Sequence, residues 1–133
     1  MEHSILTSTK KVLGIDVAYT AFDLDIITHI NAIFSTLHQM GFGPALGFTI
    51  EDATPVWTDF EADPILVSHI RTYVYLKVRL IFDPPTTSFV LAAMERQATE
   101  LEFRLSRARE DVEWVDPDPA PAPVPSIIDG GDE

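Results

Sequence analysis

One apolar segment framed by prolines constrains the fold of this chain more than any other feature. Asp63 precedes the segment Pro64–Phe82, and Pro84-Pro85 follow it closely. An acid at the N-cap with proline at the first helical position starts a helix, and paired prolines end one. The apolar residues cover most sides of that helix: Leu66, Val67, Ile70, Tyr73, Val74, Leu76, Val78, Leu80 and Ile81. Such a helix has to be surrounded, either by its own fold or by a neighbouring subunit.

Two helices are predicted before this segment. The first is expected over His3–Leu13. Over Phe22–Met40 apolar residues recur at intervals of three and four, and a glycine follows the end of each stretch. This period is that of an amphipathic helix, and glycine is a common residue just past a helix end. Thr20 and Asp23 resemble a capping box at the start of the second helix.

The connection between these helices and the central one carries weaker signals. Thr54 with Pro55 predicts one or two helical turns through Phe60, with threonine as the N-cap. Phe48–Ile50 is a short extended piece that we expect to form at most a small strand. The fold class predicted is therefore all-α, a compact helical bundle of about four main helices.

A long C-terminal helix is predicted from Thr87 to Asp111 or slightly beyond. Its apolar residues are spaced alternately by three and four: Leu91, Met94, Ala98, Leu101, Leu105, Ala108 and Val112. Three heptads are the shortest seam that supports a coiled coil. The pattern leaves two alternatives open, a coiled coil between subunits or a long helix packed on its own domain.

The chain changes character from Asp116 onward. Proline occupies every second position over 117–125, and the segment is acidic with no Lys or Arg. Proline excludes helix and favours an extended polyproline II arm. The expected organisation is a helical domain over residues 1–115 and a Pro-rich acidic tail over 116–133. Ile127 and Ile128 are candidate anchors of this arm on a partner.

Composition excludes several classes of protein. The chain has no cysteine, which removes disulfide frameworks and thiolate sites and suits a reducing compartment. A net charge of −12 argues against general nucleic-acid binding and against docking on an anionic membrane. No apolar run is long enough for a membrane span, and no signal peptide is recognisable. We expect a protein of the cytosol, or one assembled there.

The charges are unevenly distributed. Eight acids and no Lys or Arg lie between Val12 and Ile70, whereas seven bases and four acids lie from Arg71 to Arg109. One interpretation is solvated helix faces; the other is that one surface of a subunit attracts the opposite surface of its neighbour, as in a head-to-tail ring. The candidate interface residues are Arg71, Tyr75, Arg79, Arg104, Arg107, Trp114, Ile127 and Ile128.

A search for chemistry finds little. Asp25 and His29 stand one helical turn apart with Asp23 nearby, but two acids and one histidine make a weak metal site. The glycines match no phosphate-binding sequence, and no spacing assembles a catalytic triad. We predict no catalytic residues, no metal and no cofactor.

Several stretches together resemble the small head–tail connector, or adaptor, proteins of tailed bacteriophages. The first are Ser4-Ile5-Leu6-Thr7-Ser8, Lys10-Lys11-Val12-Leu13-Gly14-Ile15, Phe22-Asp23, Asp25-Ile26-Ile27 and His29-Ile30-Asn31. Then follow Gly41-Phe42-Gly43-Pro44, Gly47-Phe48-Thr49-Ile50-Glu51-Asp52, Trp57-Thr58-Asp59-Phe60 and residues 72–85, TYVYLKVRLIFDPP. The resemblance covers nearly all of residues 1–114 and does not extend to the tail.

The resemblance implies a non-enzymatic virion protein that forms a homo-oligomeric ring, typically dodecameric. The ring would dock to the portal protein, extend the DNA channel without specific DNA binding, and carry the next neck or tail-completion protein. Its place would be the virion neck, after assembly in the host cytoplasm. The alternative is a small bacterial adaptor or regulatory protein that forms an α-helical homodimer through the seam from Leu91 to Val112.

Overall fold

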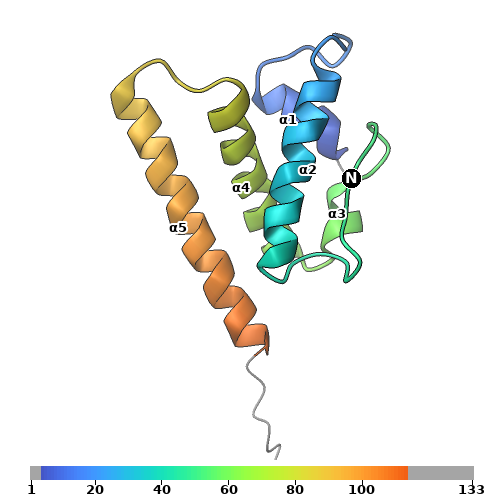
Figure 1. Ribbon diagram of the computed structural model, residues 1–133, viewed down its shortest axis with the longest axis vertical. Coiled ribbons are helices and arrows are strands. Elements are labelled where there is room, and N and C mark those ends of the chain that lie inside the picture. Colours follow the sequence, from blue (N-terminus) through green and yellow to red (C-terminus); the bar gives the residue numbers. More distant parts are fainter. Residues whose placement is uncertain (1–3, 114–133) are drawn as a thin grey trace, which may run out of the picture.

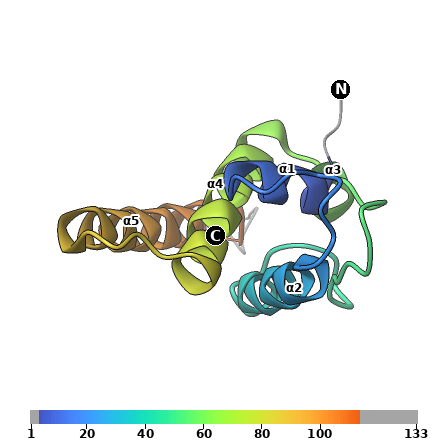
Figure 2. The same cartoon turned by 90° about the horizontal axis from the view of Figure 1, so that it is seen from above.

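The α4 helix lies at the centre of the molecule, with α5 on one flank and the other helices on the opposite flank (Figures 1 and 2). The computed structural model describes residues 4–113, with side chains as far as residue 108. Over this range the helices are α1 (Ile5–Val12), α2 (Asp23–Gln39), α3 (Trp57–Phe60), α4 (Pro64–Phe82) and α5 (Ser88–Glu113). The all-α bundle with a long last helix is confirmed, and the predicted bounds of α4 agree with the observed ones.

Two helix starts form as their sequences require. The Ser4 Oγ accepts a hydrogen bond from the backbone N–H of Thr7 at 3.1 Å, which caps α1. The Asp63 carboxylate accepts from the N–H groups of Ile65 and Leu66 at 2.9 and 3.4 Å, and Pro64 occupies the first turn of α4. Each side chain satisfies donors that have no partner within the helix.

The capping box predicted for α2 and the start predicted for α3 are wrong. The N-cap of α2 is Phe22, whose side chain makes no hydrogen bond to the helix. The capping box does not close, because the Asp23 carboxylate pairs with Lys10. The short α3 helix begins at Trp57 and not at Pro55, and the Asp59 carboxylate holds its start by accepting from the Val56 N–H at 2.9 Å.

The short strand considered at Phe48–Ile50 does not form. The amide of Asn31 on α2 takes the place of a neighbouring strand: its Oδ1 accepts from the Ile50 N–H at 2.8 Å, and its Nδ2 donates to the Ile50 carbonyl at 3.0 Å. Within residues 4–113 the one β-bridge is isolated, between Ser4 and Val56. A side chain thus satisfies the backbone of a buried residue without a sheet.

An aromatic cluster holds the loop and α3 against α2. The Phe34 ring stacks on Phe60 with a centroid distance of 4.6 Å and meets Phe48 edge-on at 5.2 Å. Trp57 is buried beside them, and its Nε1 donates to the Ser8 Oγ of α1 at 2.9 Å. These contacts place Trp57 and Phe60 in the core of the domain.

Candidate interaction surfaces

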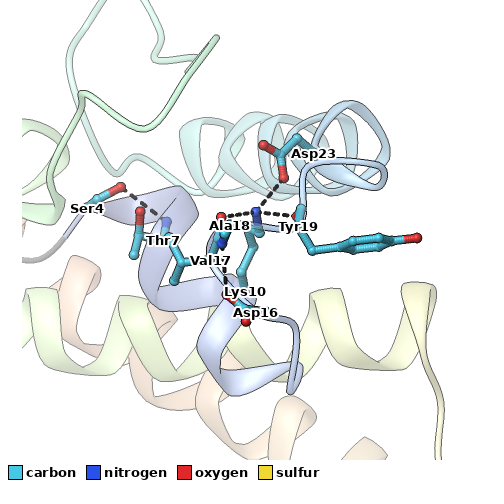
Figure 3. A network of polar contacts seen from close by, with 8 residues as sticks. All are labelled: Ser4, Thr7, Lys10, Asp16, Val17, Ala18, Tyr19 and Asp23. Atoms are coloured by element: carbon cyan, nitrogen blue, oxygen red, sulfur yellow. Dashed lines mark hydrogen bonds and ion pairs between the residues drawn. The ribbon is translucent and has the colours of Figure 1, made fainter.

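A buried lysine organises the segment between α1 and α2. Lys10 is 2% exposed, and its Nζ donates to the carbonyls of Val17 and Tyr19 at 3.0 and 2.7 Å. The same Nζ lies 2.8 Å from the Asp23 carboxylate at the start of α2 (Figure 3). An ammonium group has three hydrogens to donate, so these partners match its capacity. The lysine therefore ties residues 13–22, the α1–α2 loop, to both helices.

Local hydrogen bonds complete the shape of this loop. The Asp16 Oδ1 accepts from the Ala18 N–H at 2.9 Å, and the Asp16 carbonyl accepts from the Tyr19 N–H at 2.9 Å (Figure 3). The compact turn leaves large apolar side chains at the surface, with Val17 42%, Tyr19 53% and Phe22 40% exposed. The hydrogen-bonded loop therefore presents apolar groups to the outside.

A row of rings joins this loop to the end of α4. Phe22 meets Tyr19 edge-on at 5.7 Å and Phe82 at 5.4 Å, and His29 meets Phe82 at 6.3 Å. Beside the row lies an open pocket of about 490 Å³, lined by Gly14, Ile15, Asp16, Ala18, Tyr19 and Phe22. The lining is mainly apolar and includes one carboxylate, which suits contact with a side chain better than bond-breaking chemistry.

The inner face of α5 packs on α4. Ala98, Leu101 and Leu105 are buried, and Leu91, Met94 and Ala108 are partly buried. The Tyr73 hydroxyl donates to the Glu102 carboxylate at 2.7 Å and joins the two helices through a polar contact. Of the two alternatives for the predicted seam, the structure shows packing on its own domain over residues 91–108; the side chain of Val112 lies outside the described residues.

The outer face of α5 makes no packing contact with the other described helices over residues 88–108. Phe89 is 77% and Phe103 61% exposed, although both are large and apolar. Arg96, Arg104 and Arg107 are exposed on the same helix, and the Arg107 guanidinium lies 5.7 Å from the centre of the Phe103 ring. This face therefore combines aromatic and cationic groups.

The candidate interface residues separate into three groups. Arg104 and Arg107 are exposed on α5, where a partner can reach them. Arg71, Tyr75 and Arg79 are half-buried on α4; Tyr75 packs edge-on against Trp57 at 5.7 Å, and the Arg79 Nε donates to the Asp83 carbonyl at 3.0 Å. Trp114, Ile127 and Ile128 lie outside the described residues.

The weak metal constellation is not assembled. The Asp23 carboxylate faces Lys10, Asp25 is exposed, and His29 packs against Phe82. Among residues 4–113 no group of three or more His, Asp or Glu side chains is arranged to hold a metal ion.

Within the same range, no helix has the length and apolar character needed to cross a membrane.

Two features of these surfaces were missed from the sequence. Lys10 lies on the same face of α1 as Ile5, Leu6 and Thr9, which are all buried. A lysine in register with the apolar side of a helix is a signal for a buried, partnered ammonium. Phe89 and Phe103 fall outside the apolar seam of α5, and this position in the helical period predicts that they are exposed.

The described surface of this small helical domain carries exposed aromatic and charged side chains, as contact surfaces often do. The family comparison agrees with this observation. The chain belongs to the phage connector protein family, whose model matches residues 5–112, and it has a connector-type structural role. No curated protein and no solved structure matches the chain.

Proposed function

We propose that the chain forms a homo-oligomeric, dodecameric ring at the neck of a tailed phage and that this ring assembles in the host cytoplasm.

 The ring docks to the portal protein, extends the DNA channel, and carries the next neck or tail-completion protein. The observation that supports this most is the match of the connector family model over residues 5–112.

The electrostatics of the chain suit a channel for DNA. A net charge of −12 leaves no general affinity for phosphates, so DNA would pass through the ring without being gripped. Arg96, Arg104 and Arg107 are exposed bases on α5, and we assign them to contacts between subunits.

The homodimer alternative loses its main support. It required the seam from Leu91 to Val112 to face a second copy, whereas Leu101 and Leu105 are buried within their own domain. Separating them from α4 would expose core side chains, at a cost of about 2 kcal/mol for each leucine.

The test is the assembly state of the full chain, alone and mixed with its portal protein. We expect sedimentation velocity and negative-stain images to show a closed ring, either free or bound at one end of the portal. Exclusive occurrence as a monomer or as a two-fold symmetric dimer, with the portal present, would overturn the proposal.

A further inference from the structure

The outer face of α5 carries a regular stripe that the fold does not use. Phe89, Arg96 and Phe103 recur every seven residues, and Arg107 follows one turn later. Positions seven apart drift by only ~20° on a straight helix, so the four side chains share one face. We call Phe89, Arg96, Phe103 and Arg107 the α5 stripe. It lies opposite the buried seam.

Exposure of this stripe to water is unfavourable. Phe89 and Phe103 are 77% and 61% exposed. Burying such a side chain fully contributes about 1.5–3 kcal/mol. The two rings are about 21 Å apart along the helix and form no continuous apolar patch. Phe103 is the ring that has a cationic neighbour, since the Arg107 guanidinium lies 5.7 Å from its centre.

A complementary surface exists on the same chain. The α1–α2 loop surface consists of Val17, Tyr19, Phe22 and the pocket beside them, with Asp16 in the pocket and the exposed Asp25 on α2. No Lys or Arg occurs between Val12 and Ile70, and the Lys10 ammonium is buried against Asp23. Within α1, Lys11 is the exposed base. The loop surface is therefore apolar and mainly acidic. The outer face of α5 is aromatic and basic on balance, with Arg96, Arg104 and Arg107 against the exposed Glu100.

The two surfaces lie on opposite flanks of the molecule. Figures 1 and 2 show α5 on one side of α4, and α2 with the loop leading into it on the other. A contact between two different surfaces is heterologous, and its repetition gives a ring when the rotation closes. Like copies of a chain with a net charge of −12 repel one another unless basic groups of one face acids of the next.

We propose that the α5 stripe of one copy docks on the α1–α2 loop surface of the next copy. The Phe103 ring lies against the apolar pocket, and Arg96 and Arg107, on either side of it along α5, face Asp16 and Asp25. Apolar burial supplies most of the binding free energy, and the charges determine register. This inference rests on the proposed function, because it names the surfaces through which the ring closes.

Cross-linking between two engineered cysteines tests the pairing directly, because the chain has no cysteine of its own. Glu100→Cys on the exposed side of α5 and Ala18→Cys in the pocket leave the stripe unchanged. A mixture of the two single variants, treated with a short bifunctional thiol reagent, should give mainly the mixed dimer. Leu46→Cys, which is 101% exposed and outside both surfaces, is the control and should not link to Glu100→Cys.

Substitutions give an independent readout. Phe103→Asp should lower the association constant between subunits about tenfold or more, which corresponds to ~1.4 kcal/mol. Ile65→Asp, at a similar exposure of 70% on α4, should leave association unchanged. Arg96→Glu with Arg107→Glu should weaken assembly, and adding Asp25→Arg should restore part of it. Circular dichroism should show that every variant is folded.

The outcomes separate this inference from the proposed function. If wild-type rings form but the mixed cross-link is absent and Phe103→Asp assembles normally, the α5 stripe is not the interface and the ring proposal stands. If no ring forms even with the portal, both are wrong.

Discussion

At the scale of single residues, the Lys10 contacts are the least expected part of the structure. A buried ammonium is costly unless each of its hydrogens has a partner. Here two carbonyls and one carboxylate supply those partners. The lysine is therefore a positioning residue for the α1–α2 loop.

Replacing Lys10 with Met should destabilise the domain by about 2–3 kcal/mol, because it leaves two carbonyls and the Asp23 carboxylate without their partner. The figure is below that of a fully buried pair, since the Asp23 side chain is 26% exposed. Urea unfolding followed by circular dichroism measures the loss. Lys11→Met, at the exposed neighbouring position, is the control and should change stability by less than about 0.5 kcal/mol. Equal stabilities of the two variants would contradict this role.

The Tyr73 hydroxyl makes the stability of the domain depend on pH. Burial, followed by the hydrogen bond and the negative charge of Glu102, raises the pKa of its hydroxyl well above the ordinary range. The folded state thus favours the neutral phenol. This preference contributes to the free energy of unfolding, and the contribution is fully present below the pKa of about 10 that tyrosine has in the unfolded chain. It is lost as the pH rises from there toward the higher pKa of Tyr73 in the folded state.

We expect the free energy of unfolding of the wild type to fall more steeply above about pH 10 than that of Tyr73→Phe. Near neutral pH the variant should be less stable by about 1 kcal/mol, because it lacks the hydrogen bond to Glu102. Tyr19→Phe, at a position 53% exposed, is the control and should follow the wild type. Parallel pH profiles for all three proteins would show that Tyr73 does not control the alkaline transition.

At the scale of elements, the loop between α2 and α3 depends on a close approach of backbone to a ring. Gly43 has a φ of +85°, and a Cβ at this position would clash with the Phe60 ring. Phe60 cannot withdraw easily, because it stacks on Phe34 and meets Phe48 edge-on. The glycine therefore meets two requirements, a left-handed backbone and space for the aromatic cluster.

Gly47 offers a matched comparison. Its φ is +95°, and open space surrounds the position of a Cβ. Both Gly43→Ala and Gly47→Ala should lose about 1 kcal/mol from backbone strain. Gly43→Ala should lose about 1–3 kcal/mol more from the clash. Denaturant unfolding of the two variants measures the difference, and equal losses would mean that the ring moves aside freely.

At the scale of the whole molecule, the division into a domain over residues 1–115 and a tail over 116–133 remains a proposal. Ending the chain after Val115 should leave the stability within about 0.5 kcal/mol of the full chain, because the Pro-rich segment offers little apolar surface to bury. Ending it after Arg104 also removes the buried Leu105 and should cost about 2–5 kcal/mol. Thermal or urea unfolding of both forms checks this. A loss of several kcal/mol from the first truncation would make the tail part of the fold.

Local chemistry allowed the helices to be predicted. Periods of three and four, the Asp63-Pro64 start and the Pro84-Pro85 stop act between residues close in sequence, so they can be read without a fold. The same local information favoured a capping box at Thr20 and a helix start at Thr54, and both predictions were wrong because other contacts form there. The Asp23 carboxylate pairs with Lys10, and the Asp59 carboxylate accepts a hydrogen bond from the Val56 N–H at the start of α3.

The tertiary structure alone decided which faces remain free. The seam of α5 has the same pattern whether it meets α4 or another subunit, because periodicity identifies an apolar face and not its partner. Asn31 and Ile50 are nineteen residues apart, and Lys10 binds the carbonyls of a loop, so neither contact follows from spacing. Where a helix forms depends mainly on residues that are neighbours along the chain. Which polar groups are buried, and which face of α5 is exposed, depends on how the helices pack.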